Sequence, residues 1–375
     1  MVKSSAKQIA IRVDASTEIG TGHVMRCLTL ADALRQKGAT SIFLCRPHQG
    51  HLLDVIAERG HEVVALPELS GDWRCEVTIP PHAAWLGTSW QRDAEDTLAE
   101  LAGRKFDWLV MDHYALDARW QAAVKSAVCN LMVIDDLADR PHICDLLLDQ
   151  NLGRKPEDYA KHLVPNAKTL IGPRYALLRS EFAELRQDSL ARRKHPRLER
   201  IMVSLGGVDK ENMTSEVLDV LNDASLPDEV KIEVVMGSKS PWIDRVHARA
   251  SRMAYPTNVL VNVSDMAGLM AKSDFAVGAA GTTSWERCCL GLPSVVVIMA
   301  ENQISVAEGL SQAGAAIAVP TISKFADLAP VIFSESITKQ MSELSINSSS
   351  ICDGGGTELV VEVLSNSDTF IQVLN

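Results

Sequence analysis

The chain has 375 residues, of which 46% are hydrophobic and 23% are charged, and its formal net charge is −11. This length predicts at least two domains, since most domains have about 100–200 residues. The acidic balance argues against a nucleic-acid surface, although local N–H groups can hold a nucleotide's phosphates in an acidic protein. No segment has a signal-peptide pattern or an apolar stretch long enough to cross a bilayer. We therefore expect a soluble protein that binds neither nucleic acid nor membranes.

The eight cysteines are scattered, with no Cys-X-X-Cys pair and no Cys/His spacing typical of zinc. Such cysteines are typical of reduced thiols in a cytoplasmic protein. We expect a cytoplasmic location, no metal site and no cofactor.

In the first half of the chain, apolar runs alternate with amphipathic stretches. The runs cover residues 9–14, 41–45, 62–66, 107–112, 131–135, 146–149 and 169–171, and helical patterns cover 24–37, 52–59, 91–103 and 117–128. The runs lack strict alternation of apolar and polar residues, as expected for parallel strands that are buried on both faces. This order predicts a doubly wound α/β sheet.

A charged stretch follows at 181–199, which we interpret as a solvated helix and linker rather than a binding patch. After it the alternation restarts, with runs at 200–205, 231–236, 258–263, 274–278 and 294–299, and helical patterns at 325–345 and 358–364. We predict an N-terminal Rossmann-like domain at 1–180, a linker at 181–199, a second Rossmann-like domain at 200–350 and a tail at 351–375. The two domains would face each other across a cleft.

The most informative motif is the glycine turn that ends in His23. Gly20 and Gly22 stand between the first apolar run and the first helical pattern. A strand, a glycine turn and a helix start together expose backbone N–H groups to an anion, and a histidine there has a proton affinity suited to neutral pH. This pattern favours a catalytic histidine over one that only packs at the helix start. Arg26 would then contact phosphate or pair with Asp14.

Most other polar motifs follow predicted strands. They are Asp14, Asp112-His113-Tyr114, Asp135-Asp136 with Asp139, Asp149-Gln150-Asn151, Gly206-Gly207-Val208-Asp209, the segment 278–286 and Glu301-Asn302-Gln303. Because ligands bind at the carboxyl ends of strands in such sheets, seven motifs at equivalent positions indicate a site. Strand alternation should point His113 and Tyr114 in opposite directions, so only one of them would face the cleft.

The segment 278–286 is the best candidate for a phosphate cradle. Gly281 has no side chain, so the backbone there can approach a phosphate closely. Hydroxyls at the helix start come from Thr282, Thr283 and Ser284. Glu286 is placed to bind ribose hydroxyls. The alternative is a capping box formed by Thr283 and Glu286. The segment 71–90, with Trp73, Trp85 and Trp90, fits either a flap over the cleft or plain packing.

Taken together, these motifs resemble one family over nearly the whole chain. They are the stretches 12–26, 112–116, 133–140, 145–151, 172–178, 204–209, 278–293 and 300–303. They are similar to the PseG-type UDP-sugar hydrolases of bacterial pseudaminic acid biosynthesis, which remove UDP from UDP-2,4-diacetamido-2,4,6-trideoxy-β-L-altropyranose.

The resemblance implies a GT-B-like fold related to MurG-type glycosyltransferases and inverting hydrolysis without a metal. It also implies that His23 is the base, that 281–286 holds UDP, and that Tyr114 and Asn302 touch the sugar or the attacking water. We add Asp14 as the group that orients His23. The expected substrate-binding residues are Gly20, Gly22, Arg26, Asn151, Arg174, Ser204, Gly206, Gly207, Gly281, Thr282, Thr283, Ser284, Glu286 and Gln303.

Two other functions stay open at this point. A glycosyltransferase would use the same cleft with an acceptor, although we see no apolar, basic patch for docking to a membrane-bound lipid acceptor. A non-catalytic UDP-sugar-binding protein would keep the fold without the chemistry. We expect a monomer whose partner is the small-molecule UDP-sugar, because the cleft would form within one chain.

Overall fold

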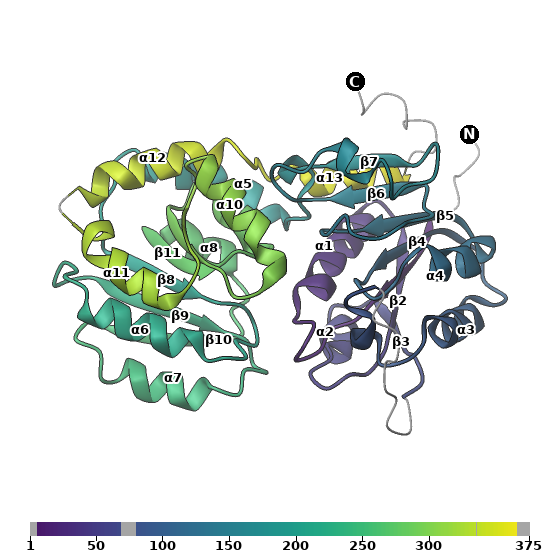
Figure 1. The fold of residues 1–375 in the computed structure, drawn as a ribbon, viewed down its shortest axis with the longest axis horizontal. Helices are drawn as coiled ribbons and strands as arrows, with labels where there is room; N and C mark the ends of the chain where they lie inside the picture. The colour runs from purple at the N-terminus through teal and green to yellow at the C-terminus, as the bar shows by residue number, and fades with distance from the viewer. Residues whose placement is uncertain (1–5, 69–79, 335, 366–375) are drawn as a thin grey trace. The chain divides into compact units, whose positions relative to one another are not determined.

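A computed structural model describes residues 6–68, 80–334 and 336–365 of the chain. The chain divides into two compact units, one made of Met1–Leu177 with Gly356–Asn375 and the other of Leu178–Gly355 (Figure 1). The chain therefore leaves the first unit, builds the whole second unit and returns. Most of the stretch expected as a linker is a helix of the second unit, α5 (Ser180–Arg192).

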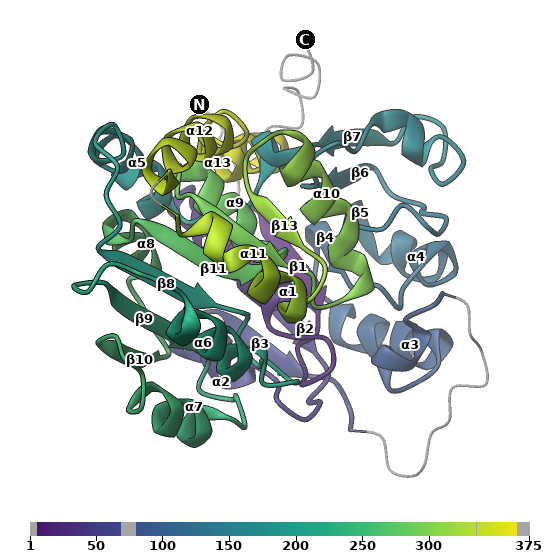
Figure 2. The same cartoon turned by 60° about the vertical axis from the view of Figure 1, so that its left-hand side comes forward.

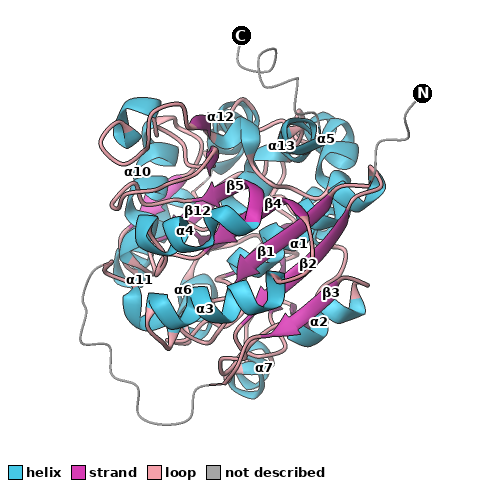
Figure 3. Ribbon diagram, turned by 90° about the vertical axis from the view of Figure 1, so that its right-hand side faces the viewer, coloured by secondary structure: helices cyan, strands magenta, loops and turns pink. Residues whose placement is uncertain are grey.

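The first unit contains a parallel sheet with the strand order β3-β2-β1-β4-β5-β6-β7. Its strands are β1 (Gln8–Val13), β2 (Thr40–Cys45), β3 (Glu62–Ala65), β4 (Phe106–Asp112), β5 (Val128–Ile134), β6 (Leu146–Asp149) and β7 (Lys168–Ile171). Its helices are α1 (Gly22–Gln36), α2 (Leu53–Glu58), α3 (Trp90–Leu101), α4 (Ala118–Val124) and α13 (Gly356–Ser365), with short 3-10 turns η1 (Ala83–Leu86), η2 (Lys125–Ala127), η3 (Pro156–Tyr159) and η4 (Pro173–Tyr175). Figure 3 shows β1, β2 and β3 side by side.

Alternation along the central strand sends side chains to two different cores. Ile9, Ile11 and Val13 of β1 pack with α1 and with the last helix, α13. Ala10 points to the opposite face, where a second core includes residues of α3 and α4. The same alternation decides to which face of the sheet each polar residue at the end of a strand points, because neighbouring residues of a strand point to opposite faces.

The second unit repeats the plan, with a parallel sheet in the order β10-β9-β8-β11-β12-β13 (Figure 2). Its strands are β8 (Arg200–Ser204), β9 (Lys231–Met236), β10 (Thr257–Val261), β11 (Phe275–Ala279), β12 (Ser294–Val297) and β13 (Ile317–Val319). Besides α5, its helices are α6 (Met213–Asp223), α7 (Ile243–Ala250), α8 (Met266–Lys272), α9 (Thr283–Cys289), α10 (Ile304–Gln312), α11 (Ile322–Ile332) and α12 (Ile337–Ser349), with the 3-10 turn η5 (Glu301–Gln303).

Two details of the second unit differ from the sequence prediction. The edge strand β13 was missed, because three residues after the small-residue stretch 313–316 are too short to show a strand pattern. The helix expected over 325–345 is two helices, α11 and α12, and α11 ends two residues after Pro330. Among the described residues, no helix is both long and apolar enough to span a bilayer.

Candidate active site

Each sheet reverses its strand order at one place, between β1 and β4 in the first unit and between β8 and β11 in the second. The loops after these strands diverge, so the carboxyl edge is open there, and ligands of doubly wound sheets bind at this position. The motifs around His23 and Asp112 lie at the first reversal, and those around Ser204 and Gly281 lie at the second.

The loop after β1 is a closed turn that delivers His23 to this edge. The Ser16 hydroxyl accepts hydrogen bonds from the backbone N–H groups of Glu18 and Ile19. Gly20 has a φ of +81°, which favours glycine, and its N–H donates to the Ser16 carbonyl. Helix α1 then begins at Gly22, so His23 stands in its first turn with only 8% of its surface exposed.

His23 is oriented by Asp112, the last residue of β4. The Nδ1 atom of His23 lies 2.6 Å from Asp112 Oδ1. Because an ionised carboxylate can only accept, the proton of the neutral imidazole is held on Nδ1 and the lone pair stays on Nε2. Burial of Asp112 alone would raise its pKa, but the charge of Arg26, the interaction with His23 and the hydrogen bonds from both residues hold that pKa well below its usual range. Asp112 is therefore a permanent anion behind the histidine.

Arg26 links this carboxylate to a second one. Its Nε and Nη2 atoms donate to Asp112 over 2.7 Å each, and its Nη1 atom donates to Asp136 over 2.7 Å. The Tyr114 hydroxyl donates to the same Asp136 oxygen over 2.6 Å. The Tyr114 ring meets the His23 ring edge-on, with centroids 4.6 Å apart. Arg26 thus fixes the two carboxylates near His23, and it pairs with Asp112 and Asp136 rather than with Asp14.

Asp14 lies outside this group, and the expectation that it orients His23 is wrong. Its carboxylate accepts two hydrogen bonds from Arg12, at 2.6 and 2.9 Å, and one from the backbone N–H of Arg46. His113 approaches Asp14 with its Nε2 atom at 3.2 Å. The physical reason is that successive residues of a strand point to opposite faces of the sheet. Asp14 and Arg12 point to the face that carries Asp93 of α3. Asp112 pairs in register with Val13 and points to the other face, which α1 covers. Asp112 is named from the sequence without a role. The alternation of side chains along the strands is the signal that could have assigned it to His23.

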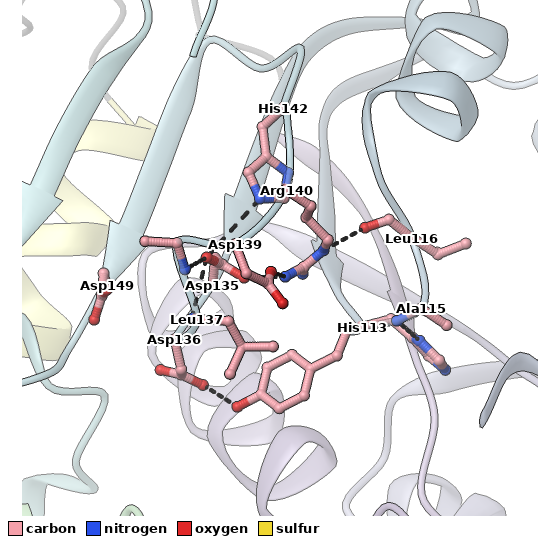
Figure 4. A network of polar contacts seen from close by, with 12 residues as sticks. His113, Ala115, Leu116, Asp135, Asp136, Leu137, Asp139, Arg140, His142 and Asp149 are labelled. Atoms are coloured by element: carbon pink, nitrogen blue, oxygen red, sulfur yellow. Dashed lines mark hydrogen bonds and ion pairs between the residues drawn. The ribbon is translucent and has the colours of Figure 1, made fainter. Parts of the chain in front are cut away.

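A second group of ionisable side chains lies next to Asp136. It contains Asp135, Asp139, Arg140 and His142 (Figure 4). The Tyr159 hydroxyl lies 2.8 Å from one oxygen of Asp135 and 2.8 Å from one of Asp149. Burial, and then the charge of Asp136, raise the pKa of Asp149 to about 7.

Asn151 belongs to the same neighbourhood, since its side-chain amide donates to the Asp136 carbonyl over 3.0 Å. The structure therefore connects Asn151 to the residues around His23 through Asp136.

In the second unit, the turn between β11 and α9 is held from inside by Arg287. Its guanidinium donates to the Ala279 carbonyl, to Ser284 Oγ and to Thr283 Oγ1 over 2.8, 3.0 and 3.3 Å. A side chain at Gly278 would meet this guanidinium at 2.5 Å, whereas one at Gly281 would meet nothing within 4 Å of the chain itself. Gly278 is therefore needed for packing, and Gly281 borders open space.

The capping box suggested as the alternative for this turn is not formed. Thr283 is already the first helical residue, and the N-cap Thr282 makes no side-chain capping bond. Glu286 Oε2 is buried and has no hydrogen-bond partner among the described residues. Burial raises the pKa of Glu286 to about 7, against the opposing charges of Arg179 and Arg287. A polar ligand would satisfy this oxygen.

The remaining expected residues are less tightly placed. Ser204 ends β8 and is buried, and Gly206 after it has a φ of +99°, as a tight turn requires. A side chain at Gly237 would overlap the Gly207 carbonyl, so that loop packs closely on Gly207.

Three further expected residues lie in exposed or half-buried positions of their own units. Arg174 is exposed, with its guanidinium 5.0 Å from the centre of the Tyr175 ring. Asn302 is exposed in η5, and Gln303 accepts a hydrogen bond from the Met299 N–H. Of the segment 71–90, residues 71–79 with Trp73 lie outside the described residues. The described residues contain no group of three or more His, Cys, Asp or Glu arranged to hold a metal ion.

The chain is similar in sequence to several known proteins. The chain is 24% identical to the UDP-2,4-diacetamido-2,4,6-trideoxy-β-L-altropyranose hydrolase of Campylobacter jejuni, over 82% of this chain and 97% of that enzyme. The predicted resemblance is confirmed. The chain is also 25% identical to the spore coat polysaccharide biosynthesis protein SpsG of Bacillus subtilis, over 82% of both chains. An uncharacterised protein of Methanocaldococcus jannaschii is 26% identical over 79% of this chain, which spans only 56% of that protein's length. No protein-family model matches the chain.

Solved structures confirm the fold. The MurG protein of Acinetobacter baumannii superposes with a TM-score of 0.65 at 15% identity, over 96% of this chain and 99% of that one. The calicheamicin glycosyltransferase CalG4 gives a TM-score of 0.59 at 15% identity, over 98% of this chain and 100% of that one. At such identities the likeness establishes the architecture alone, two doubly wound units of the GT-B type, and function must be argued from the site.

Proposed function

We propose that the protein hydrolyses a UDP-linked diacetamido-trideoxy hexose, releasing UDP and the free sugar with inversion at the anomeric carbon. The observation that carries this proposal is the pair His23–Asp112 at the glycine turn. The similarity to the Campylobacter jejuni hydrolase supports the choice of substrate.

In the proposed reaction, Nε2 of His23 takes a proton from a water molecule, and the water oxygen attacks the anomeric carbon. The bond from that carbon to the diphosphate oxygen breaks, and its electron pair leaves with UDP. Asp112 stabilises the imidazolium that forms, because it is a buried anion 2.6 Å from Nδ1. The proton then leaves His23 to solvent, which restores the base.

We assign the UDP end of the substrate to the second unit. The backbone N–H groups and hydroxyls near Gly281, Thr282 and Thr283 would stabilise the growing charge on the diphosphate. Glu286, whose Oε2 atom has no partner among the described residues, would accept hydrogen bonds from the ribose hydroxyls. These groups supply the stabilisation without a metal ion, so the proposed reaction should proceed in EDTA.

A glycosyltransferase is the second candidate, since the MurG protein and the calicheamicin glycosyltransferase share the fold. The two candidates differ in the acceptor: a hydrolase releases UDP with water alone, and a transferase needs a second hydroxyl compound. A third outcome, tight binding with no turnover, would indicate a binding protein.

The deciding experiment is proton NMR of the purified protein with UDP-2,4-diacetamido-2,4,6-trideoxy-β-L-altropyranose, in EDTA and without acceptor. We expect prompt release of UDP and of the sugar with inverted anomeric configuration. His23→Asn should lower turnover about 10²–10⁴-fold, the usual contribution of a positioned general base, and leave UDP binding intact. Turnover within about ten-fold of the wild type would refute the role of His23.

We also propose that the protein acts in the cytoplasm and as a monomer. The seven described cysteines are all free thiols, which supports a reducing compartment. Light scattering of the purified protein at working concentration tests the monomer.

A further inference from the structure

An aromatic stack stands directly beside His23. The Tyr114 ring, edge-on to His23, is stacked on its other neighbour Trp85, with ring centroids 5.9 Å apart and planes inclined by 26°. His82 completes the group, 4.4 Å from Trp85 and 5.5 Å from Tyr114. Tyr114 thus links His23 to Trp85 and His82.

The members of this stack differ in exposure. Tyr114 is 5% exposed, its hydroxyl is engaged by Asp136, and the Arg140 guanidinium lies 5.8 Å from its ring centre. Trp85 is half-buried, so part of its side chain reaches the surface. Tyr114 is therefore the buried member of the Tyr114–Trp85 pair, and Trp85 is the exposed one.

The turn that carries Trp85 is anchored independently of it. Leu86, the next residue, is 1% exposed and belongs to the core around α3 and α4. Hydrogen bonds from Trp85 N–H to the His82 carbonyl and from Gly87 N–H to the Ala84 carbonyl close η1. Trp90, four residues on from Leu86, packs against that same core. The fold thus uses Leu86 and Trp90 for packing against the core, and Trp85 stacks on Tyr114.

We propose that Trp85 forms the subsite for the apolar side of the sugar, and that it selects sugars with methyl and acetamido groups in place of hydroxyls. This inference rests on the proposed hydrolase function. Aromatic side chains offer a large apolar surface, and binding sites combine such surfaces with a few polar groups that fix orientation. A sugar that lacks the 6-hydroxyl and carries two acetyl methyls presents the apolar side that this surface fits. A hexose with free hydroxyls there would lose hydrogen bonds to water without replacement.

The test compares Trp85→Ala and Trp85→Leu with the control Trp90→Phe, which alters a tryptophan that packs against the core in the same part of the chain. For UDP-2,4-diacetamido-2,4,6-trideoxy-β-L-altropyranose we expect Trp85→Ala to raise KM about ten-fold, as for lost apolar contacts in a specificity pocket, with kcat nearly unchanged. The inhibition constant of UDP alone should not change, because UDP lacks the sugar. Trp85→Leu keeps apolar bulk without an aromatic face, so a smaller rise in KM is expected, and it carries the test if the alanine variant fails to fold.

An unchanged KM in the folded variants would overturn the subsite, and so would a parallel weakening of UDP inhibition. A failure of the proposed function looks different: the wild-type protein would neither bind UDP nor release it from the substrate. That result would refute both the proposed function and the sugar subsite.

Discussion

Replacing Asp112 by asparagine tests the assignment of the base most directly, because the side chain keeps its shape and loses its charge. Asp112 is fully buried and accepts hydrogen bonds from His23 Nδ1 and from two nitrogens of Arg26. An asparagine has one accepting oxygen and one donating amide for these three donors. If the amide faces His23, the imidazole proton moves to Nε2 and the base is lost; if it faces Arg26, two donors oppose each other.

The expected loss follows from these contacts. A hydrogen bond to a charged group contributes about 1.5–3 kcal/mol, and losing it from the transition state alone lowers kcat about 10–10²-fold. The wrong tautomer adds to this, and a comparable asparagine substitution behind a catalytic histidine lowers kcat about 10⁴-fold. We expect a decrease in kcat of about 10²–10⁴-fold. We also expect a loss of about 3 kcal/mol in the free energy of unfolding, at the low end for a broken buried pair because Asp136 still holds Arg26.

The assay is UDP release at saturating substrate, with urea unfolding and ¹⁵N imidazole shifts to read stability and tautomer. Asp14→Asn is the matched control: it removes a buried carboxylate from Arg12 but leaves His23 alone, so it should lose about 3–5 kcal/mol of stability. The kcat of its folded fraction should stay within about three-fold. The reasoning is refuted if Asp112→Asn keeps near wild-type kcat, or if Asp14→Asn lowers kcat as much.

Two further predictions concern a buried acid and a glycine pair. The pKa of Asp149 is raised to about 7 from an unfolded value of about 3.9, so its contribution to stability is complete below about pH 4 and lost as pH rises through 7. Between pH 4 and 8 the wild type should therefore lose about 2–4 kcal/mol more than Asp149→Asn in urea titrations, and parallel pH profiles would contradict the shift. Gly281→Ala should fold normally and weaken UDP binding in calorimetry, since its new methyl group enters open space where the diphosphate is assigned. Gly278→Ala should instead lower the melting temperature, because its methyl group would lie 2.5 Å from Arg287; unchanged UDP affinity in Gly281→Ala would remove the phosphate assignment.

The sequence predicts the sheets well because parallel strands are buried on both faces and leave unbroken apolar runs. It also locates the edge where His23 and Asp112 meet, since both follow such runs. It does not decide between Asp14 and Asp112, because that choice depends on which face α1 covers and on the register Val13↔Asp112. The edge strand β13 is too short to show a period.

The aromatic stack is harder still to foresee. Trp85 and Tyr114 are 29 positions apart in the sequence, and η1 is a short turn that no periodic pattern marks. Their contact depends on how Leu86 anchors that turn in the core. The sequence does not distinguish Trp85 from Trp90, which packs against that core instead.

The return of the chain to its first unit has a consequence for synthesis on the ribosome. Helix α13 supplies Val360, Val361 and Leu364 to the core beneath α1, and the Trp108 indole donates to the Leu364 carbonyl, 256 positions along the chain. Residues 178–355 form a contiguous unit and emerge before α13 does. The half of the protein that carries His23 is therefore translated first but completed last, and a ribosome that stops before Gly356 would release a finished second unit attached to an unfinished first one.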